Sequence, residues 1–163
     1  MVGADRDAVV HITIAAVGKL KAGAEQQLVS HYLKQCPWKI TMHELADAPT
    51  SLASSARLAR EATAFAPHLE NSISVALDAR GDTLSSEAFA KLIAHAMRSG
   101  KKRLTFLIGG QDGLAPELVA STTHRIAFGT MIWPHKLARV MLCEQLFRAH
   151  CILSNHPYHQ GHQ

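Results

Sequence analysis

Cysteine is scarce in this sequence, which has three cysteines and no CxxC pair. An odd, scattered set argues against a disulfide framework and against a cysteine zinc site, and it fits a reducing compartment, so we expect a cytoplasmic protein. No apolar run approaches the length that a membrane-spanning helix needs, and the first ten residues lack the order of a signal peptide. We therefore expect no membrane partner.

The usual glycine motifs for nucleotides are also missing. Gly109, Gly110 and Gly113 do not form GxGxxG, and no GxxxxGK[ST] is present. No acidic residue about twenty positions further on completes a dinucleotide fingerprint. A nicotinamide or nucleoside triphosphate site is therefore poorly supported, and on the glycines alone a tight turn without a ligand is the better explanation of GGQDG.

The bulk composition is that of a globular, mildly basic chain. Of its 163 residues, 47% are hydrophobic and 18% are charged, with a net charge of +4. We expect a flexible leader over 1–10 and one domain over 11–163. The charge permits a nucleic-acid partner without requiring one, and the densest basic cluster, 101–103, is typical of a solvated turn before a strand.

Apolar periodicity alternates along the chain between strand-like and helix-like segments. This alternation predicts an α/β fold with a mostly parallel sheet covered on both faces by helices. The expected strands cover 9–18, 38–45, 72–78, 103–110 and 124–129, and the expected helices cover 23–36, 51–66, 85–100, 115–122 and 134–153.

Three of the expected strands end in glycine-containing segments. These segments are LDARGD (77–82), IGGQDG (108–113) and FGTMIWPH (128–135). In open α/β sheets, ligands bind at the carboxyl ends of the strands, and glycine lets a ligand approach the backbone. The three strand ends are therefore the first candidates for a binding site.

The last expected helix carries charges among apolar residues on nearly every face, so these charges need partners. Glu144 and Arg148 are four residues apart and can pair along one helix face. Arg139 has no acidic partner at helical spacing, and it must reach another element, another subunit or an anionic ligand. We interpret the helix as a subunit interface that also carries a polar site.

Three histidines stand three residues apart near the end of the chain, at 156, 159 and 162. Such spacing would suit a metal on a helix. Pro157 disfavours a regular helix there, however, and no carboxylate or cysteine joins the set. Zinc binding is only weakly supported, and we expect no metal.

Several motifs together resemble one known family. The resemblance runs in order from about His11 to the end of the chain and is carried by AVGKLK (16–21), LDARG (77–81), LSSEAFA (84–90), FLIGGQDGL (106–114), MIWPHKLARVMLCEQLFRA (131–149) and NHPYH (155–159). The family is the ribosomal RNA large subunit methyltransferase H family of SPOUT methyltransferases. The resemblance implies a sheet of five to six strands flanked by helices, with a C-terminal trefoil knot, a rare exception to unknotted topology. It also implies a homodimer that uses S-adenosylmethionine to methylate N3 of a pseudouridine in 23S rRNA on the assembled 70S ribosome.

The resemblance also assigns roles to positions of this chain. It implies cofactor contacts at Leu77, Gly109, Gly110, Gly129, Thr130, Met131, Ile132, Trp133 and Pro134. It implies a catalytic polar site formed by Arg139, Glu144, Arg148, Tyr158 and His159, with His135 nearby and with the tail of one subunit completing the pocket of the other.

Within that site, His159 is the first candidate to assist loss of the N3 proton. Arg139 or Arg148 could stabilise developing negative charge or hold a phosphate. Tyr158 suits stacking on a base, with interface packing as the alternative. Asp82 and Gln160 depart from the family pattern, where a basic residue is common, and these departures bear on substrate contacts.

Two other functions stay open on the sequence. One is a SPOUT methyltransferase that acts on another RNA, such as tRNA. The other is a non-catalytic protein that binds RNA or a metal through its histidine tail. Measuring methyl transfer to different RNAs distinguishes the first alternative from an enzyme that acts on 23S rRNA. Measuring the binding of S-adenosylmethionine and of zinc distinguishes the second alternative from a methyltransferase.

Overall fold

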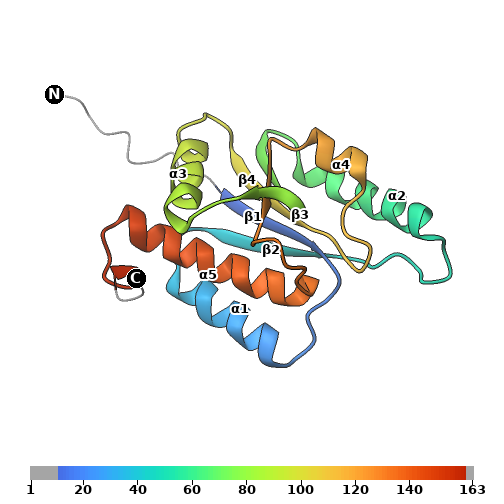
Figure 1. The fold of residues 1–163 in the computed structure, drawn as a ribbon, viewed down its shortest axis with the longest axis horizontal. Coiled ribbons are helices and arrows are strands. Elements are labelled where there is room, and N and C mark those ends of the chain that lie inside the picture. Colours follow the sequence, from blue (N-terminus) through green and yellow to red (C-terminus); the bar gives the residue numbers. More distant parts are fainter. Residues whose placement is uncertain (1–10, 161–163) are drawn as a thin grey trace.

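The computed structural model describes residues 11–160. The expected leader and the end of the histidine tail, His162 included, lie outside that range. The strands are β1 (His11–Val17), β2 (Ile40–Leu45), β3 (Ser72–Thr83), β4 (Arg103–Ile108) and β5 (His124–Ala127). The helices are α1 (Ala24–Gln35), α2 (Ser54–Phe65), the short 3-10 helix η1 (Ala66–His68), α3 (Ser86–Met97), α4 (Pro116–Ser121) and α5 (His135–Leu153) (Figure 1).

The five strands form one sheet in the order β2-β1-β4-β3-β5, and every neighbouring pair is parallel. The predicted α/β class and mostly parallel sheet are confirmed. Because all five strands point the same way, their carboxyl ends meet at one edge of the sheet. The three glycine-containing strand ends therefore lie close together, on β3, β4 and β5.

Helices cover both faces of this sheet (Figure 1). On one face, α1, α3 and α5 enclose the main core, which contains Ile14, Phe106 and Leu146. On the other face, α2 and α4 enclose a smaller core around Val17 and Leu107. The central strands are apolar on both faces, as expected for a parallel sheet buried between two helical layers. None of the helices in residues 11–160 is long and apolar enough to cross a bilayer.

The strand β3 is longer than predicted. Its expected end at 78 is wrong, because β3 continues to Thr83 after a register shift in which Leu77 and Asp82 both pair with Ile126. Gly81 makes the return possible: a Cβ on Gly81 would lie 2.7 Å from the Ile126 backbone nitrogen. The strand therefore bulges outward over 78–81, at the edge of the sheet where the carboxyl ends of the strands meet, and then rejoins β5.

The three cysteines are all free and buried. Cys36, at the end of α1, and Cys151, on α5, pack in a small cluster with Phe147, and Tyr158 lies against it. Burial raises the pKa of the Cys143 thiol to about 12. These thiols therefore belong to the packing of α1 against α5, and they stay protonated at neutral pH.

Four histidines have lowered pKa values, and we therefore predict that the fold loses stability in mild acid. Burial is the main cause that lowers the pKa of His11, His68, His135 and His150 from 6.5. Below that value the unfolded chain takes up more protons than the folded one, so the free energy of unfolding falls as pH drops from about 7 to about 5. Urea unfolding at the two pH values measures this difference, and equal or greater stability at the lower pH would contradict the prediction.

Candidate cofactor pocket and polar site

A cavity of about 140 Å³ lies at the carboxyl ends of β3, β4 and β5. Its walls come from the three strand ends that the sequence singles out. Of the predicted cofactor residues, seven line it, namely Leu77, Gly109, Gly110, Gly129, Met131, Ile132 and Trp133. Pro134 lines an adjoining groove with Gly110, and Thr130 lies in the same loop without lining either cavity.

The GGQDG segment forms a tight turn that is tied to α2. The Gly113 N–H donates to the Gly110 carbonyl at 3.1 Å. Arg57 donates to both carboxylate oxygens of Asp112, at 2.7 and 3.0 Å, and this hydrogen bonding is the main cause that lowers the pKa of Asp112. Sequence reasoning missed Arg57, because no spacing rule joins residues 55 positions apart.

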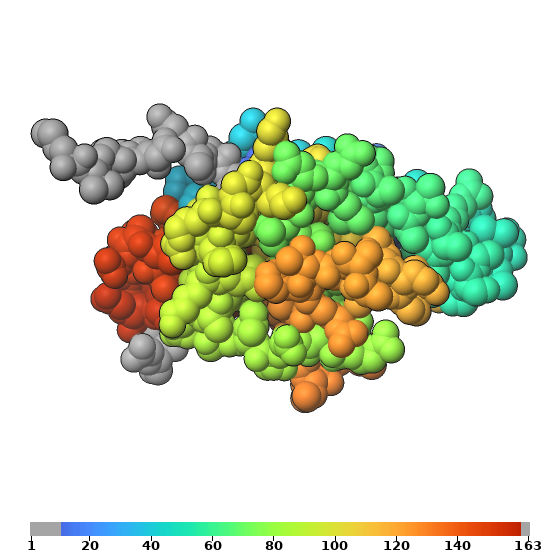
Figure 2. Space-filling model, turned by 90° about the horizontal axis from the view of Figure 1, so that it is seen from above, coloured from blue at the N-terminus to red at the C-terminus, as the bar shows by residue number. Residues whose placement is uncertain are grey.

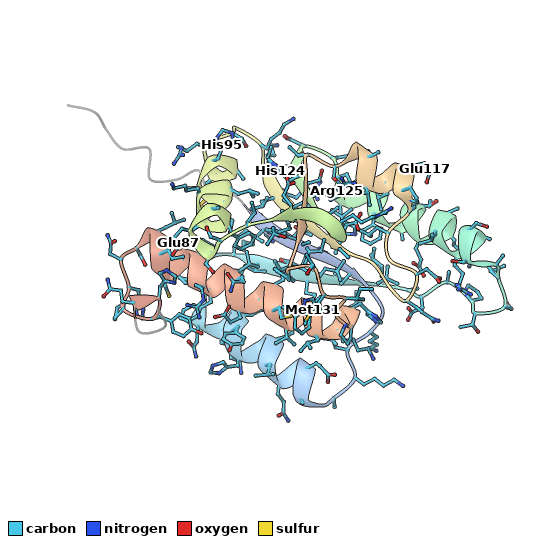
Figure 3. All side chains as sticks on the ribbon, viewed as in Figure 1. Glu87, His95, Glu117, His124, Arg125 and Met131 are labelled. Carbon is cyan, nitrogen blue, oxygen red and sulfur yellow. The ribbon has the colours of Figure 1, made fainter. Side chains whose placement is uncertain are left out.

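The loop before α5 presents apolar side chains beside the same cavity. The exposed fraction is 72% for Met131 and 87% for Ile132. Trp133 is held more closely, since its indole N–H donates to the Phe128 carbonyl at 2.8 Å. Figure 3 shows Met131 over the first part of α5. The loop therefore offers unburied apolar surface that a flat, apolar ligand face could cover.

The polar site forms around α5, further along the helix. The predicted pair is confirmed: Arg148 donates to Glu144 Oε1 at 2.7 Å. The Tyr158 hydroxyl donates to the same oxygen at 3.0 Å, and the Arg148 guanidinium lies 4.9 Å from the Tyr158 ring centroid. Burial, followed by the Glu144 charge, raises the pKa of Tyr158 to about 12, so Tyr158 is a neutral phenol near pH 7.

His159 joins this site through both ring nitrogens. Nδ1 lies 3.3 Å from an Arg148 guanidinium nitrogen, and Nε2 lies 2.8 Å from Glu87 Oε1. Arg148 has only donors, so the network assigns Nδ1 as acceptor and Nε2–H as donor to Glu87. Sequence reasoning missed Glu87, which lies in the first turn of α3.

The tail lies against its own chain. Residues 154–160 (red) pack beside α3 (yellow-green) in Figure 2, in agreement with the bond between His159 and Glu87. Tyr158 also packs on Phe147, with 4.7 Å between ring centroids. These contacts order the tail within one subunit. Completion of a partner's pocket by the same residues stays a prediction.

Arg139 lies apart from the other predicted polar residues. Its side chain is fully buried, and it donates to Glu44 at 3.1 Å and to the carbonyls of Val17 and Gly18 at 3.1 and 3.0 Å. The sequence left three kinds of partner open for Arg139: another element, another subunit or an anionic ligand. The structure shows the first of these, because Arg139 contacts the ends of β1 and β2. It does not join the cluster of Glu144 and Arg148, and its contacts are those of a structural residue.

A second groove adjoins the cavity at the strand ends. The groove has a volume of about 430 Å³. His135 lines both this groove and the cavity at the strand ends. Lys19, Lys21 and Lys136 stand along this groove, together with the carboxylates of Asp47 and Glu61. Burial is the main cause that lowers the pKa of His135, so its imidazole is neutral near pH 7.

The motifs and the fold agree with known proteins. A family model described as "Predicted SPOUT methyltransferase" matches residues 10–159. The Ribosomal RNA large subunit methyltransferase H of Bradyrhizobium diazoefficiens is 42% identical over 160 residues, which cover 93% of this chain and 100% of that protein. The chain belongs to the ribosomal RNA large subunit methyltransferase H family of SPOUT methyltransferases. This SPOUT methyltransferase is also 42% identical to the protein of that name from Caulobacter vibrioides, over 91% of this chain and 97% of that one.

Solved structures support the fold. A probable methylase family protein from Haemophilus influenzae matches with a TM-score of 0.58 and 13% identity, covering 92% of this chain and 70% of that chain. A probable methyltransferase from Bordetella pertussis matches with a TM-score of 0.55 and 12% identity, covering 87% and 97%. At such low identity these likenesses show the SPOUT methyltransferase fold alone.

S-adenosylmethionine is the cofactor of this SPOUT methyltransferase. The cofactor combines a flat adenine with a positively charged sulfonium. The residues that line the cavity at the strand ends have a chemistry that suits both parts. Its apolar walls and its glycines suit the adenine, and Asp78 contributes a buried carboxylate oxygen that has no hydrogen-bond partner within residues 11–160.

Two glycines provide a matched test of this cavity. A Cβ on Gly109, in the GGQDG turn, would lie 2.2 Å from the Gly113 carbonyl oxygen, whereas a Cβ on Gly100, which does not line the cavity, would meet nothing within 4 Å. We expect Gly109→Ala to distort the turn and weaken S-adenosylmethionine binding at least about tenfold. The control Gly100→Ala has only the strain of its positive φ and should cost about 1 kcal/mol of stability with little loss of affinity. Calorimetric titration measures the affinity of each variant for S-adenosylmethionine, and equal affinities of the two variants would contradict the prediction.

Proposed function

We propose that this SPOUT methyltransferase transfers a methyl group from S-adenosylmethionine to N3 of a pseudouridine in 23S rRNA on the assembled 70S ribosome. The observation that carries the proposal is the end-to-end match to relatives named for ribosomal RNA methylation. When bound, the cofactor supplies an activated methyl group, so the chain's own residues have to orient the acceptor, exclude water and receive a proton.

The polar site supplies the proton chemistry in this proposal. N3 of the base carries a proton that has to leave before or during methyl transfer. Nε2–H of His159 donates to Glu87, which leaves the basic lone pair on Nδ1. In the structure this lone pair accepts from Arg148 at 3.3 Å, and in the proposal Nδ1 accepts the N3 proton when Arg148 turns to the base. Arg148 lies beside it and stabilises negative charge on the base. Glu144 holds Arg148 and Tyr158 in place, and Tyr158, packed on Phe147, supports the Arg148 guanidinium from below.

Spacing along α5 supports a shared site in a homodimer. Ala138 lines the cofactor cavity, and Arg148 lies ten residues further on, about 15 Å along the helix axis. Figure 3 shows Met131 near the start of α5 and Glu87 near its other end. Methyl transfer needs near contact between donor and acceptor. We therefore propose that the polar site of one subunit faces the cofactor of its partner.

The groove beside the cofactor cavity supports an RNA substrate. Lys19 and Lys21 follow β1, and Lys136 stands in the first turn of α5, so three ammonium groups border the cofactor side of the molecule. Lysines at such a position suit the phosphate backbone, which positions RNA without reading its sequence. Because the chain has only a modest net positive charge of +4, recognition of the RNA in this proposal rests on the dimer and on the shape of the ribosome.

The knot implied by the resemblance is also part of the proposal. β5 lies at an edge of the sheet beside β3, whereas α5 packs against both α1 and α3. The chain therefore turns back across the carboxyl ends of the strands after β5. That return path supports a C-terminal knot around the 78–83 and 109–115 segments.

Methyl transfer to three acceptors tests the substrate. The purified protein is incubated with labelled S-adenosylmethionine and with 70S ribosomes lacking the modification, free 23S rRNA, or tRNA. We expect transfer to the ribosomes alone, at a pseudouridine N3. Transfer to tRNA instead would favour the alternative SPOUT activity. If calorimetry shows tight zinc binding and no cofactor binding, the non-catalytic alternative replaces the enzyme.

A further inference from the structure

Asp78 carries the one buried carboxylate oxygen within residues 11–160 that has no hydrogen-bond partner. It follows Leu77, where β3 bulges away from β5. Its Oδ1 accepts a hydrogen bond from the Arg80 backbone N–H at 3.1 Å, and the Arg80 side chain approaches the same oxygen at 3.5 Å. Its Oδ2 is buried and has no hydrogen-bond partner within residues 11–160. Burying a carboxylate oxygen without a partner is costly, so this atom needs an explanation.

The carboxylate lies at the edge of the cavity, because Asp78 is one of the residues that line it. Among the other residues that line the cavity in the described chain, His135 is the one with a titratable side chain, and the rest are apolar residues and glycines. Arg80 is not a lining residue of the cavity, and 73% of its side chain is exposed to solvent. Its side chain approaches only Oδ1 of Asp78. The side chain of Asp78 is 13% exposed. A negative charge at this position therefore acts through poorly solvated surroundings, where its attraction for a cation is stronger than in water.

The methyl donor and the spent product differ in charge at one atom. S-adenosylmethionine carries a sulfonium cation, and S-adenosylhomocysteine carries a neutral thioether at the same position. Their adenine, ribose, ammonium and carboxylate groups are the same. A protein group that favours the donor has to respond to the missing charge or the missing methyl group, and hydrogen bonds to the shared groups cannot make that distinction.

We propose that the Asp78 carboxylate complements the sulfonium charge and thereby favours binding of the methyl donor over its demethylated product. The inference rests on the proposed placement of the cofactor in this cavity, and it goes beyond the cofactor contacts that the resemblance assigns. Release of the product then follows from the transfer itself, because loss of the methyl cation removes the charge that Asp78 holds. Asp78 is a specificity residue for the cofactor and takes no part in moving the N3 proton.

Calorimetric titration of the full chain with three ligands tests the proposal. The ligands are S-adenosylmethionine, S-adenosylhomocysteine and sinefungin, which carries an amine in place of the sulfonium. We expect Asp78→Asn to weaken S-adenosylmethionine and sinefungin about tenfold and to change S-adenosylhomocysteine less than about twofold. The Asn side chain keeps an oxygen for the Arg80 N–H, so the turn survives. Asp82→Asn is the matched control on the same strand, with an exposed side chain, and it should leave all three affinities unchanged.

The outcomes separate this inference from the proposed cofactor site. Equal weakening of S-adenosylmethionine and S-adenosylhomocysteine by Asp78→Asn would overturn charge discrimination, and so would unchanged affinities. If Gly109→Ala also leaves S-adenosylmethionine affinity intact, the cofactor lies elsewhere and the site assignment itself fails. Thermal unfolding checks that each variant is folded. Asp78→Ser, which keeps a short polar group without charge, provides the same comparison if the Asn variant does not fold.

Discussion

Replacing Arg148 by Ala is expected to reduce methyl transfer by about 10²–10³-fold and to leave the affinity for S-adenosylmethionine within about twofold of the original. Arg148 pairs with Glu144, lies over the Tyr158 ring and contacts Nδ1 of His159. Its loss removes the positive charge beside the base and also frees both tail residues. The cavity at the strand ends keeps all its lining residues.

Single-turnover methylation of ribosomes and cofactor titration measure the two effects separately. Arg60→Ala is the matched control, because Arg60 is an exposed arginine on α2, away from α5. Activity close to that of the original protein in Arg148→Ala would remove this residue from the site. Tyr158→Phe refines the experiment: it keeps the packing on Phe147 and deletes only the hydroxyl that donates to Glu144.

The structure changes what deletion of the tail would test. From the sequence, removing 155–163 is expected to abolish methylation and to leave folding and cofactor binding largely intact, because the segment lacks typical core-forming residues. Tyr158, however, packs against the cluster of Cys36, Phe147 and Cys151. Deletion therefore removes buried apolar contact as well as the polar site, and we expect a measurable loss of stability together with the loss of activity. Point substitutions separate the two effects.

Replacing Arg139 by Ala is expected to destabilise the fold by about 3–5 kcal/mol. The substitution leaves a cavity at a fully buried position, and it leaves the carbonyls of Val17 and Gly18 and the carboxylate of Glu44 without their donor. Urea unfolding measures the loss. Glu44→Gln is the control: Glu44 is partly exposed, and glutamine keeps an oxygen for Arg139, so its effect should be much smaller.

The same variant distinguishes a structural role from a catalytic one. If Arg139 acts as the buried contact that the structure shows, activity per folded molecule in Arg139→Ala at low temperature stays near that of the original protein. Normal stability combined with lost methylation would contradict this and would return Arg139 to the catalytic site. Light scattering on the same samples reports whether dimerisation changes.

Local patterns predicted much of the structure. Alternating apolar periods gave the element order, and the pair of Glu144 and Arg148 followed from helix spacing alone. The three glycine-containing strand ends predicted where a cavity lies, because parallel strands bring their carboxyl ends to one edge. The unpartnered Arg139 was recognised as needing a partner, but the partner itself was not identified.

Contacts between distant segments account for what the sequence did not reveal. Glu44 lies 95 positions from Arg139, and Glu87 lies 72 positions from His159. No period or spacing relates such residues, because the tertiary fold alone brings them together. The extension of β3 was missed for a similar reason: LDARGD is typical of a turn, and its return to the sheet depends on how closely Gly81 can approach β5.

The buried thiols at the contact between α1 and α5 can report how often these two helices separate. Cys36 and Cys151 lie in one small cluster, and Cys143 stands in the main core on the same helix as Cys151. A protonated, enclosed thiol does not react with an alkylating reagent until the surrounding helices separate. The alkylation rate of each cysteine therefore reports how often its part of the α1 and α5 contact opens, without an added label.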